Sequence, residues 1–249
     1  MATDHTFQPA IVVPVYNHEV AIPNTLSNLL KSGLPILLVD DGSDSVCEQV
    51  LQTLATENSE RVFLHRLPYN SGKGAAVKAG LRWLANAGYS HGLQIDADGQ
   101  HDANDVPKFI AAAESNPEHV VTGYPQYDDS VPLVRFYCRY LTHVLVWLST
   151  LSFEVKDTMC GFRVYPIKPI LPLLAKCGDR MDFDSEIMVR WVWLGNNVTN
   201  LPTKVHYPKD GVSHFLLWKD NSLMTWMHIR LVFGMLIRSP KLLWRKLRG

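Results

Sequence analysis

The chain of 249 residues has no excess of basic over acidic residues, since 24 Lys and Arg stand against 24 Asp and Glu. This balance excludes the general electrostatic attraction by which proteins bind the phosphates of nucleic acid, and we expect no nucleic-acid partner. Intrinsic disorder is excluded as well, because 47% of the residues are apolar and 19% are charged. A chain of this length and composition can bury a substantial core.

Cysteine is scarce, and the four residues lie too far apart for a Cys-x-x-Cys metal or redox motif; they are Cys47, Cys138, Cys160 and Cys177. Reduced thiols in a cytoplasmic protein are the simplest interpretation. We expect no signal peptide, because residues 1–9 are polar and lack a basic segment followed by an apolar one. The longest nearly apolar runs, residues 141–151 and 231–237, are shorter than the roughly 20 residues that span a bilayer.

Acidic residues are absent after Asp220, and residues 221–249 carry a charge of +6 that the rest of the chain balances. This tail mixes its basic residues with tryptophan and other apolar residues, which fits an amphipathic helix lying on an anionic membrane. The alternative is an ordinary C-terminal helix packed on the domain, with its arginines in solvent. We favour the first, and expect a cytoplasmic protein that is peripheral on the inner face of the membrane.

Five short apolar segments predict β-strands, at residues 10–15, 35–40, 62–67, 92–96 and 119–123. Their starts are 25 to 30 residues apart, which leaves room for a helix in each βαβ crossover. Helices are predicted between them at residues 21–32, 44–56, 72–87 and 105–115. We therefore expect an α/β fold in residues 8–125, with a doubly wound, mostly parallel sheet and helices on both faces.

The second half of the chain is less regular. It predicts a long helix at residues 133–152, a loop around 157–163, a helix at 182–194 and a strand at 198–205. The tail is predicted as a helix that Pro240 interrupts. We divide the chain into a domain of residues 1–220, with halves 8–125 and 126–220, and the tail.

Polar residues gather where four predicted strands end. The segments are Pro14-Val15-Tyr16-Asn17, Asp40-Asp41-Gly42-Ser43, Asn70-Ser71-Gly72-Lys73-Gly74 and Asp96-Ala97-Asp98-Gly99-Gln100-His101. Because ligands bind at the carboxyl ends of the strands in an open parallel sheet, we expect one site along that edge.

The pair Asp96 and Asp98 is the most informative of these. Two carboxylates one residue apart repel each other unless a cation lies between them. Mg²⁺ is typically held by one or two carboxylates and substrate phosphates, and Gln100 adds a neutral oxygen. We expect Asp96, Asp98 and Gln100 to bind Mg²⁺ or Mn²⁺ with a diphosphate. The alternative is a turn whose aspartates cap the helix that starts near Asp102.

Three neighbouring residues leave two interpretations open. Asp41 could accept hydrogen bonds from a base or ribose, or its segment, residues 40–43, could be only a turn with the N-cap of the next helix. Tyr16 could stack on a base or lie in the core. Lys73, at a glycine-rich helix start, suits an anion, or is a solvated surface lysine. It does not belong to a Walker A loop, because Gly74 follows it.

Four segments resemble, in their order and spacing, the signatures of family 2 glycosyltransferases with the GT-A fold. They are residues 12–17 (VVPVYN), 39–43 (VDDGS), 70–74 (NSGKG) and 95–100 (IDADGQ). Residues 157–163 (DTMCGFR) resemble an element of the branch that transfers sugars to dolichyl and polyprenyl phosphates. That branch has Gly-Ser-Arg after strand five, where this chain has Gly123-Tyr124-Pro125, and the family often has glutamate where this chain has His18.

The resemblance implies an inverting transferase that moves a sugar from a UDP- or GDP-sugar to a lipid-linked or other envelope-type acceptor, with a divalent cation. The expected nucleotide-sugar-binding residues are Pro14, Tyr16, Asn17, Asp41, Lys73, Asp96, Ala97, Asp98 and Gln100. Arg139 falls near an arginine that the branch uses for an acceptor phosphate. Arg163 either contacts a phosphate or pairs with Asp157.

A hydroxyl acceptor needs a general base, whereas a phosphate acceptor is already anionic. Asp184 and Glu186, where related enzymes place an acidic residue, are the candidate catalytic residues, and a helix cap is their alternative role. Rival functions are a sugar nucleotidyltransferase and a non-catalytic nucleotide-sugar-binding module. The first usually has a glycine-rich, arginine-containing loop after strand one, which is absent here, and intact Asp96, Asp98 and Gln100 argue against the second.

Overall fold

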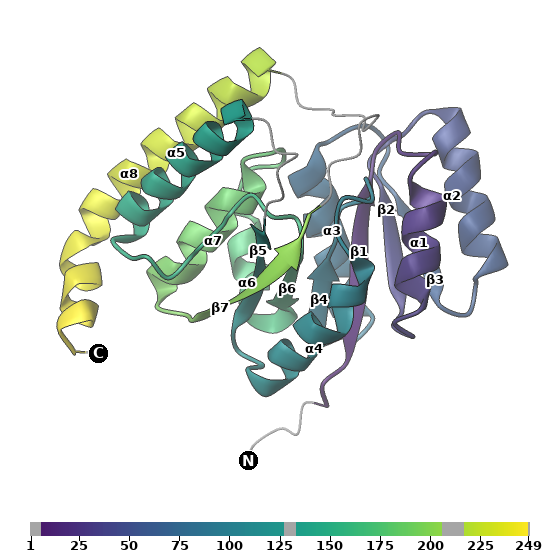
Figure 1. Cartoon of the computed structure of the whole chain (residues 1–249), viewed down its shortest axis with the longest axis horizontal. Helices are drawn as coiled ribbons and strands as arrows, with labels where there is room; N and C mark the ends of the chain where they lie inside the picture. Colours follow the sequence, from purple (N-terminus) through teal and green to yellow (C-terminus); the bar gives the residue numbers. More distant parts are fainter. Residues whose placement is uncertain (1–5, 127–132, 206–216, 249) are drawn as a thin grey trace.

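The computed structural model describes residues 6–126, 133–205 and 217–248. Its centre is one seven-stranded sheet of order β3-β2-β1-β4-β6-β5-β7 (Figure 1). The strands are β1 Pro9–Val15, β2 Ile36–Asp40, β3 Val62–Arg66, β4 His91–Gln94, β5 Val120–Gln126, β6 Arg163–Pro166 and β7 Val198–Lys204. Only β6 among these runs antiparallel to its neighbours, so the expected mostly parallel sheet is confirmed.

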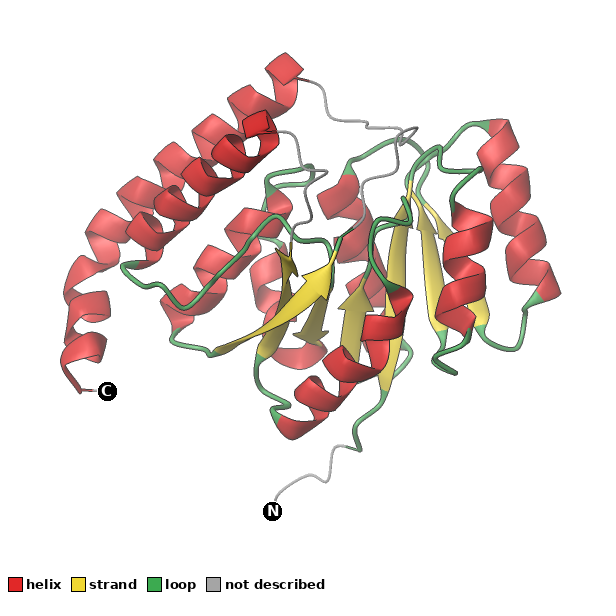
Figure 2. Ribbon diagram, viewed as in Figure 1, coloured by secondary structure: helices red, strands yellow, loops and turns green. Residues whose placement is uncertain are grey.

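Helices cover both faces of the sheet, as the spacing of the strands predicts (Figure 2). They are α1 Ile22–Leu30, α2 Ser45–Glu57, α3 Lys73–Asn86, α4 Val106–Ser115, α5 Leu133–Thr150, α6 Ile167–Leu174, α7 Phe183–Leu194 and α8 Leu217–Arg248, and the short 3-10 helix η1 Ala103–Asp105 precedes α4.

The two faces of the sheet have separate cores, because successive side chains of a strand point to opposite sides. Val12 and Leu37 pack with α3, α6 and α7 on one face. Ile11 and Leu38 pack with α1, α2 and α4 on the other. Burial on both faces explains why these strands are continuously apolar.

Two elements lie where the sequence predicts none. Strand β6 begins at Arg163, the last residue of the predicted loop, and inserts between β4 and β5, and α6 follows it directly. A run of four residues is too short to show the alternation of apolar and polar residues that indicates a strand. An antiparallel strand also departs from the regular βαβ order of the preceding segments. Pro240 does not divide the tail into two helices as predicted, because α8 continues through this residue, although it bends near its C-terminal end (Figure 1).

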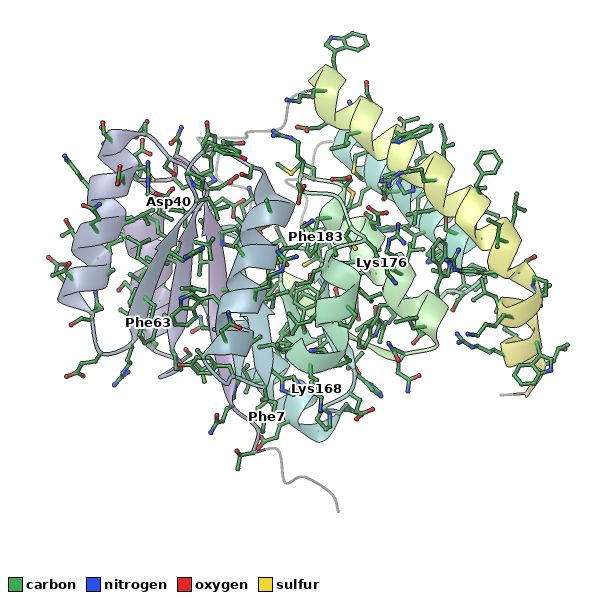
Figure 3. The ribbon with its side chains drawn as sticks, turned by 180° about the vertical axis from the view of Figure 1, so that it is seen from behind. Phe7, Asp40, Phe63, Lys168, Lys176 and Phe183 are labelled. Atoms are coloured by element: carbon green, nitrogen blue, oxygen red, sulfur yellow. The ribbon has the colours of Figure 1, made fainter. Side chains whose placement is uncertain are left out.

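Helices α5 and α8 lie side by side at one end of the molecule, outside α7 (Figures 1 and 2). Within the three described ranges, no helix is both long enough and apolar enough to cross a bilayer. The opposite side of the molecule holds β1, β2 and β3. Figure 3 shows Asp40 at the carboxyl end of these strands, and Phe7, which precedes β1, at the other end. The polar segments therefore share one edge of the sheet.

Candidate functional site

Hydrogen bonds join the loops that follow β1 and β2. The backbone N–H of Asn17 donates to Ser43 Oγ at 3.1 Å, and Asn17 Oδ1 accepts from the N–H of Asp44 at 2.9 Å. Asn17 adopts a left-handed backbone with φ of 48°, which asparagine tolerates better than most residues. Tyr16 beside it is partly exposed rather than buried in the core, while Pro14 is buried within β1.

Asp41 is held by the loop before α3. Its two carboxylate oxygens accept the backbone N–H groups of Ser71 at 2.7 Å and Gly72 at 2.8 Å. Burial nevertheless raises the pKa of Asp41. The alternative that residues 40–43 hold the N-cap of the next helix is wrong, because the cap of α2 is Asp44, whose Oδ1 accepts from the first turn of the helix.

The turn that carries Asp96, Ala97 and Asp98 follows β4. Thr25 of α1 donates to the carbonyl of Ala97 at 3.2 Å, and Asp98 Oδ1 accepts the backbone N–H of Gln100 at 3.0 Å. The alternative that Asp96 and Asp98 cap the next helix is wrong as well, because Asp102 caps η1. Gln100 thus contributes its backbone amide to this turn.

Lys73 lies between two carboxylates. Its Nζ is 2.8 and 2.9 Å from the two oxygens of Asp96 and 2.9 Å from Asp184 Oδ2. Burial alone would lower the pKa of Lys73, but the two carboxylates raise it well above its ordinary value. The interpretation as a solvated surface lysine is wrong, because only 18% of the side chain is exposed.

Asp96 and Asp98 fit a cation that is shared with a diphosphate. Burial, and after it the charge of Asp96, raises the pKa of Asp98. The second of these causes is a repulsion between two carboxylates, which a metal ion would relieve. Nδ1 of His101 is buried and has no hydrogen-bond partner in the described structure. No three His, Cys, Asp or Glu side chains of the described residues are grouped closely enough to hold a metal by themselves. The residues therefore suit Mg²⁺ or Mn²⁺, whose remaining ligands come from phosphates.

The loop of residues 157–163 packs directly on Asp96. A Cβ on Gly161 would lie 2.0 Å from Asp96 Oδ2, so only glycine leaves room for this carboxylate. The loop is held by Asp157, whose Oδ1 accepts the backbone N–H groups of Met159 and Cys160, both at 2.8 Å.

Asp157 also anchors α5. Arg139 donates from Nε at 2.5 Å and from Nη2 at 2.8 Å to its two oxygens, and His143 Nε2 lies 3.0 Å from Oδ2. Burial would raise the pKa of Asp157, but the charge of Arg139 and the bond from His143 hold it far below its usual range. This bidentate pair places Arg139 beside the loop that touches Asp96.

Arg163 is a buried structural residue rather than a contact for an acceptor. Its guanidinium is fully buried and donates to the carbonyls of Thr158, Cys160 and Asp184 and to the hydroxyls of Thr122 and Tyr165. The alternative pairing with Asp157 is also wrong, because Asp157 binds Arg139 and His143. Of the two predicted acceptor arginines, Arg139 alone remains a candidate.

The two candidate bases point in different directions. Asp184 lies at the site, where it pairs with Lys73 and accepts from Gln94 at 3.2 Å. Glu186 is fully buried away from it and accepts from Gly178, Arg190 and Arg230. Burial raises the pKa of Asp184, but Lys73 and then Arg163 more than offset this and lower it.

Sequence reasoning gave no role to His101 or His143. His101 directly follows the Asp-x-Asp turn, and its position in that segment was the available signal. His143 sits one helical turn after Arg139, and only the fold shows that both side chains reach Asp157.

Comparisons with known proteins agree with this geometry. The family model described as glycosyl transferase family 2 matches residues 10–165. A dolichyl-phosphate beta-glucosyltransferase of Dictyostelium discoideum is 31% identical over 204 residues, which cover 72% of this chain and 60% of that protein. An undecaprenyl-phosphate 4-deoxy-4-formamido-L-arabinose transferase of Shewanella sediminis is 29% identical over 180 residues, which cover 70% of this chain and 52% of that protein. The chain thus spans little more than half the length of these two relatives.

Among solved structures, a mannosyltransferase of Pyrobaculum calidifontis in complex with GDP-Man and Mn²⁺ superposes with a TM-score of 0.62. It is 18% identical, and the match covers 94% of this chain and 66% of that one. At this identity the likeness concerns the fold.

Proposed function

The chain belongs to glycosyltransferase family 2, and we propose that it transfers a sugar from a nucleoside-diphosphate donor to the phosphate of a polyprenyl lipid. It has the GT-A fold and resembles the polyprenyl-phosphate sugar transferase branch. The names of two relatives specify dolichyl and undecaprenyl phosphate as their acceptors, which supports the same class of acceptor here.

The observation that carries the proposal is the state of the two candidate bases. Asp184 is paired with Lys73 and has a lowered pKa, which makes it a poor proton acceptor. Glu186 is paired with Arg190 and Arg230 away from the site. A hydroxyl acceptor would have to lose a proton to such a base. A phosphate acceptor is already ionised and attacks without one, so it suits this site better.

On the donor side, we propose that Pro14, Tyr16, Asn17 and Asp41 hold the nucleoside of a UDP- or GDP-sugar. We retain Asp96, Asp98 and Gln100 as the residues that would hold Mg²⁺ or Mn²⁺, with phosphate oxygens of the donor as the remaining ligands. As a Lewis acid, the cation would stabilise charge on a departing phosphate. Ala97 and Gln100 supply backbone groups of this turn. Lys73 adds a positive charge beside Asp96 that favours the diphosphate.

On the acceptor side, Asp157 orients Arg139 toward the phosphate of the incoming lipid. An attack from this side, opposite the leaving diphosphate, inverts the anomeric carbon. We retain the division into a donor half, residues 8–125, and an acceptor half, residues 126–220. Residues 206–216 of the latter lie outside the described part of the chain.

A lipid acceptor requires access to a membrane, and α8 has the composition for it. Large apolar side chains are exposed along it; they are Trp218, Trp226, Ile229, Phe233, Leu236, Ile237, Leu243, Trp244 and Leu247. Three of its arginines are engaged with α7: Arg230 pairs with Glu186, Arg238 lies over the ring of Trp193, and Arg245 donates to the carbonyls of Trp193 and Leu194. We therefore propose that apolar contact, more than charge, brings this peripheral protein to the inner face of the membrane.

The test is transfer to farnesyl phosphate, a short soluble isoprenoid phosphate. The purified chain is incubated with labelled UDP- or GDP-sugars and Mn²⁺ or Mg²⁺, and label is measured in the organic-extractable product. We expect transfer from one of the donors to farnesyl phosphate and none to farnesol. Transfer to farnesol or to a sugar hydroxyl would contradict a phosphate acceptor. Pyrophosphate-dependent formation of the nucleotide-sugar would indicate a nucleotidyltransferase, and binding without any turnover a non-catalytic module.

A further inference from the structure

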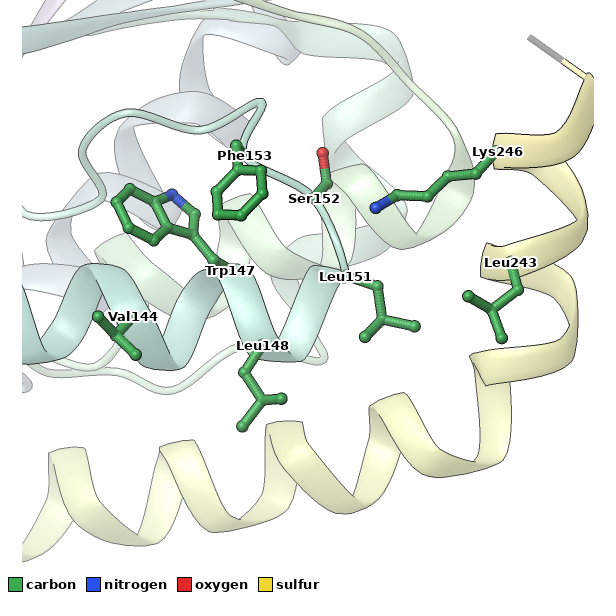
Figure 4. Close-up of a pocket in the computed structure, with 8 residues that line it drawn as sticks. All are labelled: Val144, Trp147, Leu148, Leu151, Ser152, Phe153, Leu243 and Lys246. Carbon is green, nitrogen blue, oxygen red and sulfur yellow. The ribbon is translucent and has the colours of Figure 1, made fainter.

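A pocket of about 420 Å³ lies between the C-terminal end of α5 and the end of α8 (Figure 4). Its walls are Val144, Trp147 and Leu148 of α5, Leu151, Ser152 and Phe153 of the following loop, and Leu243 and Lys246 of α8. Figure 4 shows that α8 turns sharply before it reaches Leu243, as proline inside a helix commonly causes. This bend brings the last turns of α8 over the end of α5.

The walls of the pocket are apolar and are held by contacts within the protein. The rings of Trp147 and Phe153 are 5.2 Å apart, and Trp147 Nε1 donates to the carbonyl of Val155 at 2.9 Å. The only polar side chains among its wall residues are Ser152 and Lys246. Its size falls in the range of small-molecule sites, and its walls match a hydrocarbon rather than a sugar or a nucleotide.

A continuous series of contacts links this pocket to the candidate acceptor site. The rings of Trp147 and His143 are 6.2 Å apart on the same face of α5, and His143 reaches Asp157, the partner of Arg139. Arg139 and Trp147 are eight residues apart, which is about 12 Å along a helix axis.

An exposed apolar stripe runs beside these contacts along α5. It consists of Tyr140, Val144 and Leu148, which are spaced four residues apart and therefore lie on one face of the helix. The rings of Tyr140 and Trp147 are 6.3 Å apart. Val144 and Leu148 of this stripe also line the pocket, so the apolar chain of a ligand whose anionic end lies near Arg139 could follow the stripe into it.

Charge at the pocket favours an anionic lipid. Lys246 stands at its rim, Lys241 is exposed on the same segment of α8, and no acidic residue follows Asp220 in the chain. The cations that dock α8 on α7 are the arginines described above, so these two lysines are available to phosphate groups at a membrane surface.

We propose that the pocket between α5 and α8 binds the isoprenoid chain of the acceptor lipid while its phosphate lies near Arg139. This inference rests on the proposed function and adds a specific subsite for the chain. The pocket would select acceptors by the apolar group next to the phosphate, and would hold that phosphate beside Asp157 and Arg139 at the mouth of the donor site.

The experiment measures binding by calorimetry, without donor or metal, so that it does not depend on turnover. The probes are farnesyl phosphate, farnesol and inorganic phosphate. The test variants are Leu148→Asp and Leu243→Asp, whose side chains are 46% and 51% exposed in the protein, so both are expected to fold. The matched control is Ile237→Asp, which places the same charge on an 80% exposed apolar residue of α8 outside the pocket.

We expect the unaltered chain to bind farnesyl phosphate more tightly than either farnesol or inorganic phosphate. Each test variant should weaken binding of farnesyl phosphate by about tenfold or more, because a charge in an apolar pocket opposes burial of the chain. Ile237→Asp should stay within about twofold of the unaltered chain, since its side chain lies outside the pocket. Circular dichroism verifies that all three variants fold.

Normal binding of farnesyl phosphate by both test variants would overturn the proposal. So would equal weakening by Ile237→Asp, which would indicate a general apolar surface, or a dimer of the unaltered chain that Leu148→Asp dissociates in sedimentation velocity. Failure of the proposed function would give a different result. Binding that depends on the isoprenoid chain, without sugar transfer, would support the pocket and contradict the transferase activity. Transfer to farnesyl phosphate that Leu148→Asp leaves unchanged would support the transferase activity and contradict the pocket.

Discussion

The proposed donor and acceptor halves hold their functional side chains in different ways. In the donor half, Asp41 accepts backbone N–H groups of the loop before α3, and Asp98 accepts one within its own turn, so backbone groups fix both carboxylates. In the acceptor half, Arg139 and Asp184 are fixed by ion pairs with residues of other elements. Side chains that accept backbone N–H groups lie in short polar segments that the sequence reveals, whereas ion pairs between distant elements depend on how those elements pack. The donor half can therefore be predicted more fully from sequence, and the acceptor half is more sensitive to substitutions that change a charge.

Two contacts join these halves at Asp96. Lys73 bridges Asp96 to Asp184 at the start of α7, and the backbone of Gly161 packs against the Asp96 carboxylate. The Asp96 carboxylate of the donor half is thus positioned partly by residues of the acceptor half, namely Asp184 and Gly161. Changes on the two sides of this junction should affect different measurable quantities, which the following predictions use.

The largest effect is expected from Asp98→Asn in the donor half. Loss of the second carboxylate removes a ligand for the cation, and catalytic turnover should fall by about 10³-fold or more while the fold is kept. Mn²⁺ affinity, measured by electron paramagnetic resonance, should fall in parallel. The control is Asp102→Asn, which alters the cap of η1 outside the carboxylate pair. Retained turnover and Mn²⁺ affinity in Asp98→Asn would remove the metal assignment.

Next in size is the effect of Asp157→Asn on the stability of the acceptor half. Asp157 is buried and paired with Arg139, and breaking such a pair costs about 3 kcal/mol of unfolding free energy at neutral pH. Its pKa in the folded protein lies below the ordinary value of 3.8. The ionised carboxylate therefore adds stability at neutral pH, and this contribution is lost as the pH falls below about 4.

Urea unfolding at several pH values tests this. The difference between the unaltered chain and Asp157→Asn should be largest near neutral pH and should shrink toward about pH 3. Asp179→Asn, which removes the more exposed partner of Lys78, should cost less than about 1 kcal/mol. A difference that does not change with pH would mean that packing, rather than the ion pair, anchors α5.

The sequence predicts the donor half almost completely, for the physical reason given above. Strands β1 and β2 are buried, nearly continuous apolar runs of the kind that a doubly covered parallel sheet requires, and the polar segments at their ends meet as expected. The fold of the acceptor half is predicted less well, because β6 is short, antiparallel and inserted between strands that are neighbours in the chain order.

Within the site, the residue types were predicted and their partners were not. The sequence marks Lys73 as a cation at a helix start, but its two carboxylate partners lie 23 and 111 residues away. Arg163 sits in a motif that suggests a phosphate ligand, yet five protein acceptors bury it. Pairings over such sequence distances depend on tertiary packing, which carries no local signal.

A smaller effect on turnover is expected from Gly161→Ala, which acts on the junction itself. The added Cβ would lie 2.0 Å from Asp96 Oδ2, so the carboxylate must move. A displacement of this kind costs about 10²-fold in turnover. Mn²⁺ affinity should fall too, and Met159→Ala in the same loop should change neither quantity by much. Normal turnover in Gly161→Ala would show that the position of Asp96 is not set by the acceptor half.

The smallest effect is expected from Asp184→Asn, and it distinguishes the two kinds of acceptor. If Asp184 only balances the charge of Lys73 and Arg163, its loss should reduce turnover by about tenfold, and the pH profile should keep its shape. If it were a general base, turnover should fall by about 10²- to 10⁴-fold, and the acidic limb of the profile should disappear. Glu186→Gln is the matched control on the same helix: it should lower the melting temperature, because Arg190 and Arg230 lose their charged partner, with little change in turnover. A loss of 10³-fold in Asp184→Asn with normal donor binding would therefore indicate a hydroxyl acceptor, and the charge-paired half of the molecule would then contain the base after all.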